Sequence, residues 1–196
     1  MLLRKTNNIL VVIALLLSLY IIVNPLTPSI RFVFRDKSPE TIAPYSGELA
    51  EVYGSEPTSQ IPKDNRLVIP SIGIDEAVLE SDNIGVIDNG GTWRRPATST
   101  PNKGGNTVIV GHRFYGQGGS TFYNLDKLSI NDTLAVYWEG KEYLYSVADV
   151  KVVRPSSIEI EAPTADDRLT LYTCTPLWTA RDRLVIIAKP IETKSQ

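Results

Sequence analysis

The sequence contains one cysteine and one histidine, so chemistry that needs a thiol or an imidazole must use Cys174 or His112. A thiolate attacks acyl carbonyls far better than a thiol, and a nucleophilic cysteine therefore needs a base or a cation nearby. His112 can take the thiol proton and later protonate a departing amine. Arg183 stays charged and can donate hydrogen bonds to the oxyanion that forms on the attacked carbonyl. These three residue types are sufficient for acyl transfer.

Taken singly, each of these residues has a plainer structural explanation. A lone cysteine at a strand end is usually a small buried hydrophobe, a lone histidine near glycine usually caps or lies on the surface, and an arginine that opens a strand is usually solvated. All three, however, lie at predicted strand edges, where rigid elements can direct side chains into one cleft.

The elements that must position them are predominantly strands. Short runs rich in β-branched and aromatic residues predict strands at 66–70, 76–80, 106–112, 133–138, 141–153, 168–174 and 183–189. Glu139-Gly140 predicts a tight hairpin between two of them. One short helix is expected after Ser120, over FYNLDKL. This pattern indicates an all-β domain, a closed barrel or a sandwich.

Composition excludes several other classes of protein. The chain has 196 residues and a net charge of −2, which argues against a basic nucleic-acid-binding face. The single cysteine excludes an internal disulfide framework, and the single histidine excludes a multi-histidine zinc site.

The N-terminus is strongly apolar from Ile9 to Val23 and follows Arg4 and Lys5. This pattern predicts a cytoplasmic tip and a transmembrane signal anchor over residues 1–26, with a cleaved signal or a buried core helix as alternatives. Residues 27–61 are expected to form an extracytoplasmic linker, in which SGELAEVYG could form a helical turn or two. Residues 62–196 form the expected outer domain. Basic residues on both sides of the anchor set its orientation only weakly.

Several motifs resemble those of sortases, the bacterial surface-protein transpeptidases, in the same order along the chain. TLYTC at 170–174 resembles their TLxTC signature, and GN at 105–106 with VGHR at 110–113 is similar to the segment that bears their histidine. Arg183 in RLVIIA matches their arginine on the next strand, and RLVIPSIGI at 66–74 is similar to their first barrel strand. The resemblance covers about residues 62–190.

The resemblance implies a closed β-barrel of about eight strands with one or two short helices. It makes Cys174 the nucleophile, His112 the general acid/base and Arg183 the oxyanion- or substrate-orienting cation, with Thr173 lining the substrate groove. Such an enzyme, anchored in the bacterial cell membrane, would cleave an LPxTG-like sorting motif of secreted proteins through a thioacyl-enzyme. It would then transfer the peptide to an amine on a cell-wall precursor or a pilin lysine.

Two loops carry further expectations. Residues 155–167 would help close over the sorting peptide, and Trp178 lies in the short loop beside Cys174, where it could line the groove. Arg183 follows Cys174 by only nine residues, which favours a short-looped class over class A. No cofactor or metal is expected; Asp166-Asp167 could suggest calcium, but six or more oxygen ligands would be needed.

Other readings of the same residues are open. Papain-like proteases place the cysteine before the histidine, and the active cysteine of L,D-transpeptidases follows Ser-His-Gly, so both differ from this chain. A cysteine peptidase that only hydrolyses and a non-catalytic, membrane-anchored β-domain that binds a surface partner are the remaining alternatives.

Overall fold

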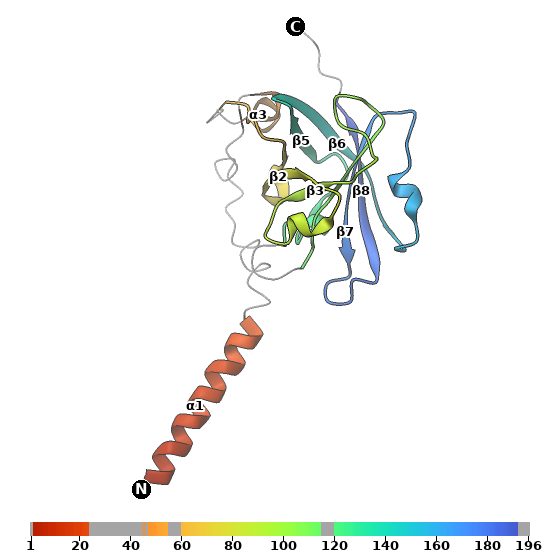
Figure 1. Ribbon diagram of the computed structural model, residues 1–196. Helices are drawn as coiled ribbons and strands as arrows, with labels where there is room; N and C mark the ends of the chain where they lie inside the picture. Colours follow the sequence, from red (N-terminus) through yellow and green to blue (C-terminus); the bar gives the residue numbers. More distant parts are fainter. Residues whose placement is uncertain (1, 24–44, 46, 55–59, 115–119, 192–196) are drawn as a thin grey trace. The chain divides into compact units, whose positions relative to one another are not determined.

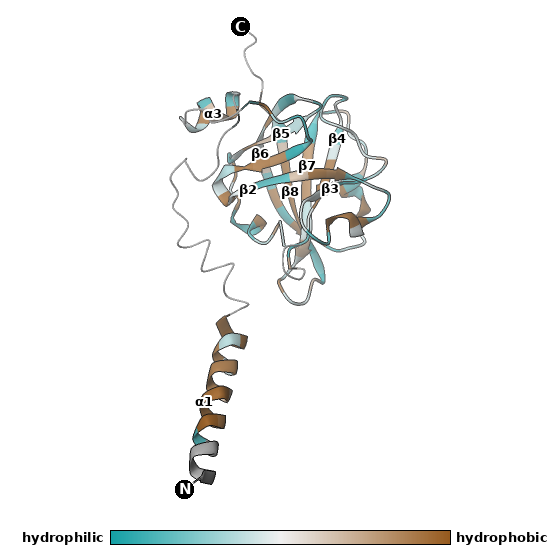
Figure 2. Cartoon of the chain, turned by 60° about the vertical axis from the view of Figure 1, so that its left-hand side comes forward, coloured by the Kyte–Doolittle hydropathy of each residue, from teal (hydrophilic) through white to brown (hydrophobic). Residues whose placement is uncertain are grey.

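A computed structural model of the chain describes residues 2–23, 45, 47–54, 60–114 and 120–191. Contacts divide the chain into two compact units, Met1–Asp36 and Lys37–Gln196. The first unit contains helix α1 (Leu2–Val23), in which large apolar side chains are exposed from Ile9 onward (Figure 2). None of the described helices combines the length and the apolarity that a membrane span requires. The membrane anchor stays a prediction from the sequence.

The described part of the second unit is an eight-stranded closed barrel, which confirms the all-β prediction (Figure 1). Neighbouring strands follow the order β1-β2-β3-β4-β7-β8-β6-β5, and β5 pairs with β1 to close it. The strands are β1 (Arg66–Ile69), β2 (Ile74–Glu80), β3 (Thr92–Arg94), β4 (Asn106–Val110), β5 (Thr133–Trp138), β6 (Lys141–Val153), β7 (Arg168–Thr175) and β8 (Asp182–Pro190). Most neighbours are antiparallel, but β2 with β3 and β4 with β7 run parallel.

The predicted hairpin joins β5 to β6. Trp138 pairs with Lys141, so Glu139 and Gly140 form a two-residue turn. Both have positive φ, 51° and 74°, which is the backbone that a tight turn between twisted strands requires. The sequence prediction is confirmed here.

The helix predicted after Ser120 is instead a series of turns with one 3-10 helix, η5 (Leu125–Lys127). Phe122, Leu125 and Leu128 are all buried, and their spacing of three residues matches the 3-10 period. The buried side chains therefore select the tighter helix, and this segment packs into the barrel core.

A short helix, α3 (Glu48–Tyr53), packs on the barrel although it falls in the stretch that the sequence analysis treats as a linker. Leu49 is fully buried in a cluster with Val68, Ala135, Tyr137 and Leu144. The Glu142 carboxylate accepts hydrogen bonds from the Glu48 and Leu49 backbone amides, which satisfies two N–H groups at the start of the helix. The folded domain thus includes α3.

Candidate active site

The three candidate catalytic residues lie in one row across neighbouring strands. β4 and β7 pair in parallel with a constant register that ends at Val110 opposite Tyr172. Beyond β4 the alignment continues, because Thr173 Oγ1 donates to the Gly111 carbonyl at 2.7 Å and Arg113 Nη1 donates to Thr175 Oγ1 at 2.7 Å. The register thus places His112 level with Cys174.

Arg183 occupies the next place in this row. Cys174 in β7 and Arg183 in β8 are direct cross-strand partners. Neighbouring strands lie about 4.8 Å apart, and directly paired residues project to the same face of a sheet. The structure therefore brings the predicted sulfur, imidazole and guanidinium to adjacent positions at one end of the sheet.

The row lies on the outer face of the barrel. Along β7, Leu169, Leu171 and Thr173 are buried toward the interior, whereas Tyr172 and Cys174 are partly exposed on the other face. Cys174 carries a free thiol. A strand that places alternate residues inside the core thus presents the thiol to solvent at its outer surface.

Thr173 has a different surrounding from the groove wall that the resemblance implies. Its side chain is only 1% exposed, because its place in the strand alternation directs it inward. Its hydroxyl instead joins β7 to the Gly111 carbonyl, one residue before His112. In this structure Thr173 holds the two strand ends together.

The backbone at His112 is fixed from its other side by the segment 120–128. The His112 carbonyl accepts a hydrogen bond from the Phe122 amide at 2.9 Å. A Cβ at Gly111 would come within 2.7 Å of the buried Phe122 ring, so only glycine fits at this packing distance. The Gly-His pair is therefore required by packing as well as by chemistry.

Asp88 contacts the imidazole, and the sequence analysis missed this role. Its Oδ1 atom lies 3.1 Å from His112 Nε2. Asp88 follows a 3-10 helix, η4 (Ile84–Ile87), in a segment that the sequence analysis identified only as a turn. Because 24 residues separate the two side chains and the carboxylate belongs to a turn, no local spacing signal pointed to the pair.

Arg183 also supports the loop after Cys174. Its Nη1 donates to the carbonyls of Ala180 at 3.2 Å and Asp182 at 3.0 Å. β7 ends at Thr175 and β8 begins at Asp182, so the short loop expected from the sequence is confirmed. The guanidinium is thereby held at the edge of the row.

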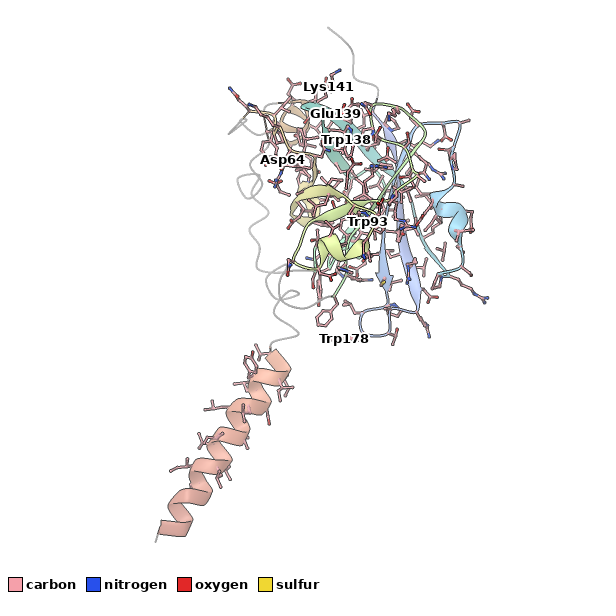
Figure 3. All side chains as sticks on the ribbon, in the orientation of Figure 1. Asp64, Trp93, Trp138, Glu139, Lys141 and Trp178 are labelled. Carbon is pink, nitrogen blue, oxygen red and sulfur yellow. The ribbon has the colours of Figure 1, made fainter. Side chains whose placement is uncertain are left out.

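Trp178, in this loop, is 65% exposed and has a φ of 77°. A positive φ is uncommon for such a bulky residue. Its ring contacts that of Phe114, with 4.5 Å between centroids. Figure 3 shows Trp178 at the end of the barrel away from Trp138, Glu139 and Lys141. The two aromatic rings therefore lie close to the segments that carry His112 and Cys174.

The segment between β6 and β7 covers the outer face next to Cys174. Its Glu161 carboxylate accepts a hydrogen bond from the Tyr172 hydroxyl at 2.5 Å and from Arg95 Nε at 3.0 Å. Burial raises the pKa of Tyr172, and the bond to Glu161 raises it further. This segment, which includes a 3-10 helix, η6 (Ile158–Glu161), is thus fixed to the strand that bears the thiol.

The acidic pair considered for calcium has other contacts. Asp166 lies 3.7 Å from Lys189 Nζ, and Asp167 accepts a hydrogen bond from the Gly105 amide at 2.8 Å. In the described ranges, no group of three or more acidic, histidine or cysteine side chains is placed to hold a metal ion.

Two hollows of about 490 Å³ lie away from the row. One is lined by residues of α3, β6 and the Gly104-Gly105 turn, and the other by residues 97–99, 103–106 and 161–167. Neither is lined by Cys174, His112 or Arg183. The thiol therefore faces an open surface, as expected for a site that takes an extended chain.

A profile of the sortase domain matches residues 67–191. The chain belongs to the sortase family. Members of this family are cysteine transpeptidases, and the match spans the strands that carry all three residues of the row. The predicted resemblance is confirmed at the level of the family.

Individual relatives agree with this assignment. Sortase SrtE1 of Streptomyces coelicolor is 29% identical over 99 residues, which is 46% of this chain but only 28% of that protein's length. A pilus-related sortase C of Group B Streptococcus is 28% identical with a TM-score of 0.60, covering 66% of this chain and 68% of that one. Sortase A of Corynebacterium diphtheriae has the same fold, with 23% identity, a TM-score of 0.61, and 70% and 64% coverage. The short-looped class stays a prediction.

Proposed function

We propose that this protein is a sortase-type cysteine transpeptidase that cleaves an LPxTG-like sorting motif of secreted proteins. Cys174 is the nucleophile, His112 the general acid/base and Arg183 the cation at the reacting carbonyl. The observation that supports this assignment is the common register of the three residues on β4, β7 and β8.

Acylation begins with the transfer of the Cys174 thiol proton to the His112 imidazole. The thiolate then attacks the carbonyl carbon of the scissile peptide bond and forms a tetrahedral oxyanion. His112 returns the proton to the departing amine nitrogen as the C–N bond breaks. The product is a thioester between Cys174 and the sorting peptide.

Arg183 stabilises the oxyanion in this scheme. Nη1 is bound by two loop carbonyls, so the guanidinium is held in place before the substrate arrives. A donor that is already oriented contributes more to the transition state than one that must reorganise. The planar group also offers N–H donors beyond Nη1.

The thioester is then resolved by an amine on a cell-wall precursor or by a pilin lysine. His112 accepts a proton from the attacking nitrogen, and Cys174 leaves as the thiolate. Trp178 and Phe114, exposed at the edge of the site, supply apolar surface for the peptide.

The proposal includes the cellular placement of the enzyme. Residues 1–26 anchor it in the bacterial cell membrane as a single span, residues 27–61 carry the linker, and the catalytic domain 62–196 is extracytoplasmic. The apolar character of Ile9–Val23 supports this placement.

The test is mass spectrometry of products from candidate sorting peptides, with and without an amine acceptor. We expect cleavage after the motif threonine, a thioester on Cys174, and a peptide–amine conjugate when the acceptor is present. Products that are always free acids would leave a hydrolysing cysteine peptidase as the better description.

Two variants test the residue assignments in the same assay. Cys174→Ala and His112→Ala are each expected to abolish turnover while the far-UV circular dichroism stays unchanged. Turnover by either variant would refute its assigned role, and no turnover by the wild type on any sorting peptide would favour a non-catalytic binding domain.

A further inference from the structure

Asp88 and His112 are brought together by a shared hydrophobic contact. Ile87, directly before Asp88, packs in one cluster with Trp93 and with Val110, two residues before His112. Ile87 is fully buried, and Trp93 Nε1 donates to the Ser81 carbonyl at 2.7 Å, which holds the same segment to β3. Packing thus fixes both partners of the 3.1 Å contact.

The backbone before Asp88 is also well defined. The Asn83 side chain accepts a hydrogen bond from the Gly85 amide at 2.8 Å and begins η4. The Asp88 amide donates to the Gly85 carbonyl at 3.2 Å, so Asp88 closes the 3-10 turn. The carboxylate is therefore presented from an ordered element.

We infer that Asp88 is the positioning residue of the catalytic histidine: it accepts the Nε2 proton of His112 and leaves Nδ1 as the basic atom. This inference rests on the proposed function of His112. A carboxylate is only an acceptor, so the contact places the proton of the neutral imidazole on Nε2.

The carboxylate also acts during the reaction. When Nδ1 takes the thiol proton of Cys174, the ring becomes an imidazolium whose positive charge faces Asp88. An adjacent negative charge stabilises that state and holds the ring in place. The proton on Nδ1 then passes to the departing amine, and Asp88 remains ionised throughout.

The test compares Asp88→Ala and Asp88→Asn with Asp82→Ala, which removes an exposed carboxylate from the same loop. We expect kcat on the sorting peptide to fall about 10- to 100-fold in both Asp88 variants, with KM within about twofold. Asp82→Ala should keep the wild-type kcat. Unfolding temperatures are measured alongside, and Asp88→Asn decides if Asp88→Ala is unstable.

Two further readouts are independent of the peptide. The chain has one histidine, so ¹⁵N-histidine labelling reports a single imidazole. We expect a slowly exchanging Nε2 proton in the wild type and in Asp82→Ala that is lost in Asp88→Ala. We also expect iodoacetamide to alkylate Cys174 about tenfold more slowly in Asp88→Ala.

The outcomes separate this inference from the proposed function. Wild-type kcat, or an unchanged imidazole spectrum, in the Asp88 variants would overturn the positioning role. If His112→Ala retains turnover, the proposed function of His112 fails first, whatever Asp88 does.

Discussion

Gly111 lies against the ring of Phe122 so closely that a methyl group would overlap it. Gly111 immediately precedes His112, and the Phe122 amide binds the His112 carbonyl. The position of the imidazole is therefore coupled to the packing of the segment at 120–128.

Gly111→Ala is expected to destabilise the domain and lower turnover together. Overpacking of a buried site costs about 1–3 kcal/mol, and relief of the overlap moves the backbone that carries His112. Urea unfolding and peptide turnover measure the two effects. In a double-mutant cycle with Phe122→Ala, the two stability losses should add to less than their sum; strict additivity would contradict the overlap.

Arg113 is expected to be needed for the strand end after Cys174. It is 7% exposed and lies between Thr175 and Asp126, whose Oδ1 is 3.0 Å from Nη2. Arg113→Ala leaves these groups without their partner and should lower the free energy of unfolding by about 1–3 kcal/mol. Arg181→Ala, at an exposed arginine, should change it by less than about 0.5 kcal/mol. Equal losses in chemical denaturation would exclude a special role for Arg113.

Arg183→Lys should fail to restore activity. A single ammonium cannot bind two loop carbonyls and also donate to an oxyanion in the planar geometry of a guanidinium. Loss of one oxyanion donor lowers kcat by about 10²–10³-fold, and the lysine variant should stay near that level. Steady-state kinetics of Arg183→Lys beside Arg181→Lys give the comparison. A lysine variant with near-wild-type kcat would show that charge alone is sufficient.

Glu76→Gln should stabilise the protein at neutral pH. Burial raises the pKa of Glu76 above its ordinary value of 4.5, although Arg66 and the Gly91 amide oppose the shift. The folded state therefore binds more protons between the two pKa values, and the free energy of unfolding falls as pH rises through them. The gain from glutamine should be full at pH 7 and vanish below pH 4.5 in urea titrations. Glu51→Gln, at an exposed carboxylate of α3, serves as the control; a gain independent of pH would refute the explanation.

Sequence patterns predicted the barrel because its strands are long runs of β-branched and aromatic residues. They missed β3, which has only three residues and follows the glycines of a turn. Short parallel pairing of this kind depends on partners distant in sequence. The helix expected after Ser120 failed because buried residues at intervals of three select a 3-10 geometry.

The site was predictable as far as side-chain chemistry and motif order allowed. Cys174, His112 and Arg183 could be singled out by residue type, and the register of three strands brings them together. Asp88 could not be found, because a turn aspartate has no distinguishing local pattern. The inward orientation of Thr173 follows from strand alternation, but only once the core face of β7 is known.

The parallel pairing of β4 with β7 separates two kinds of sequence change. Adding residues to the long excursion between these strands leaves the hydrogen-bond ladder intact, so its loops can be exchanged between relatives to alter which peptide is taken. Adding a single residue inside β7 ahead of the thiol would turn the sulfur toward the core and shift it by about 3.3 Å. Loop grafting is therefore the tolerant route to new specificity, whereas indels within these two strands should eliminate the enzyme.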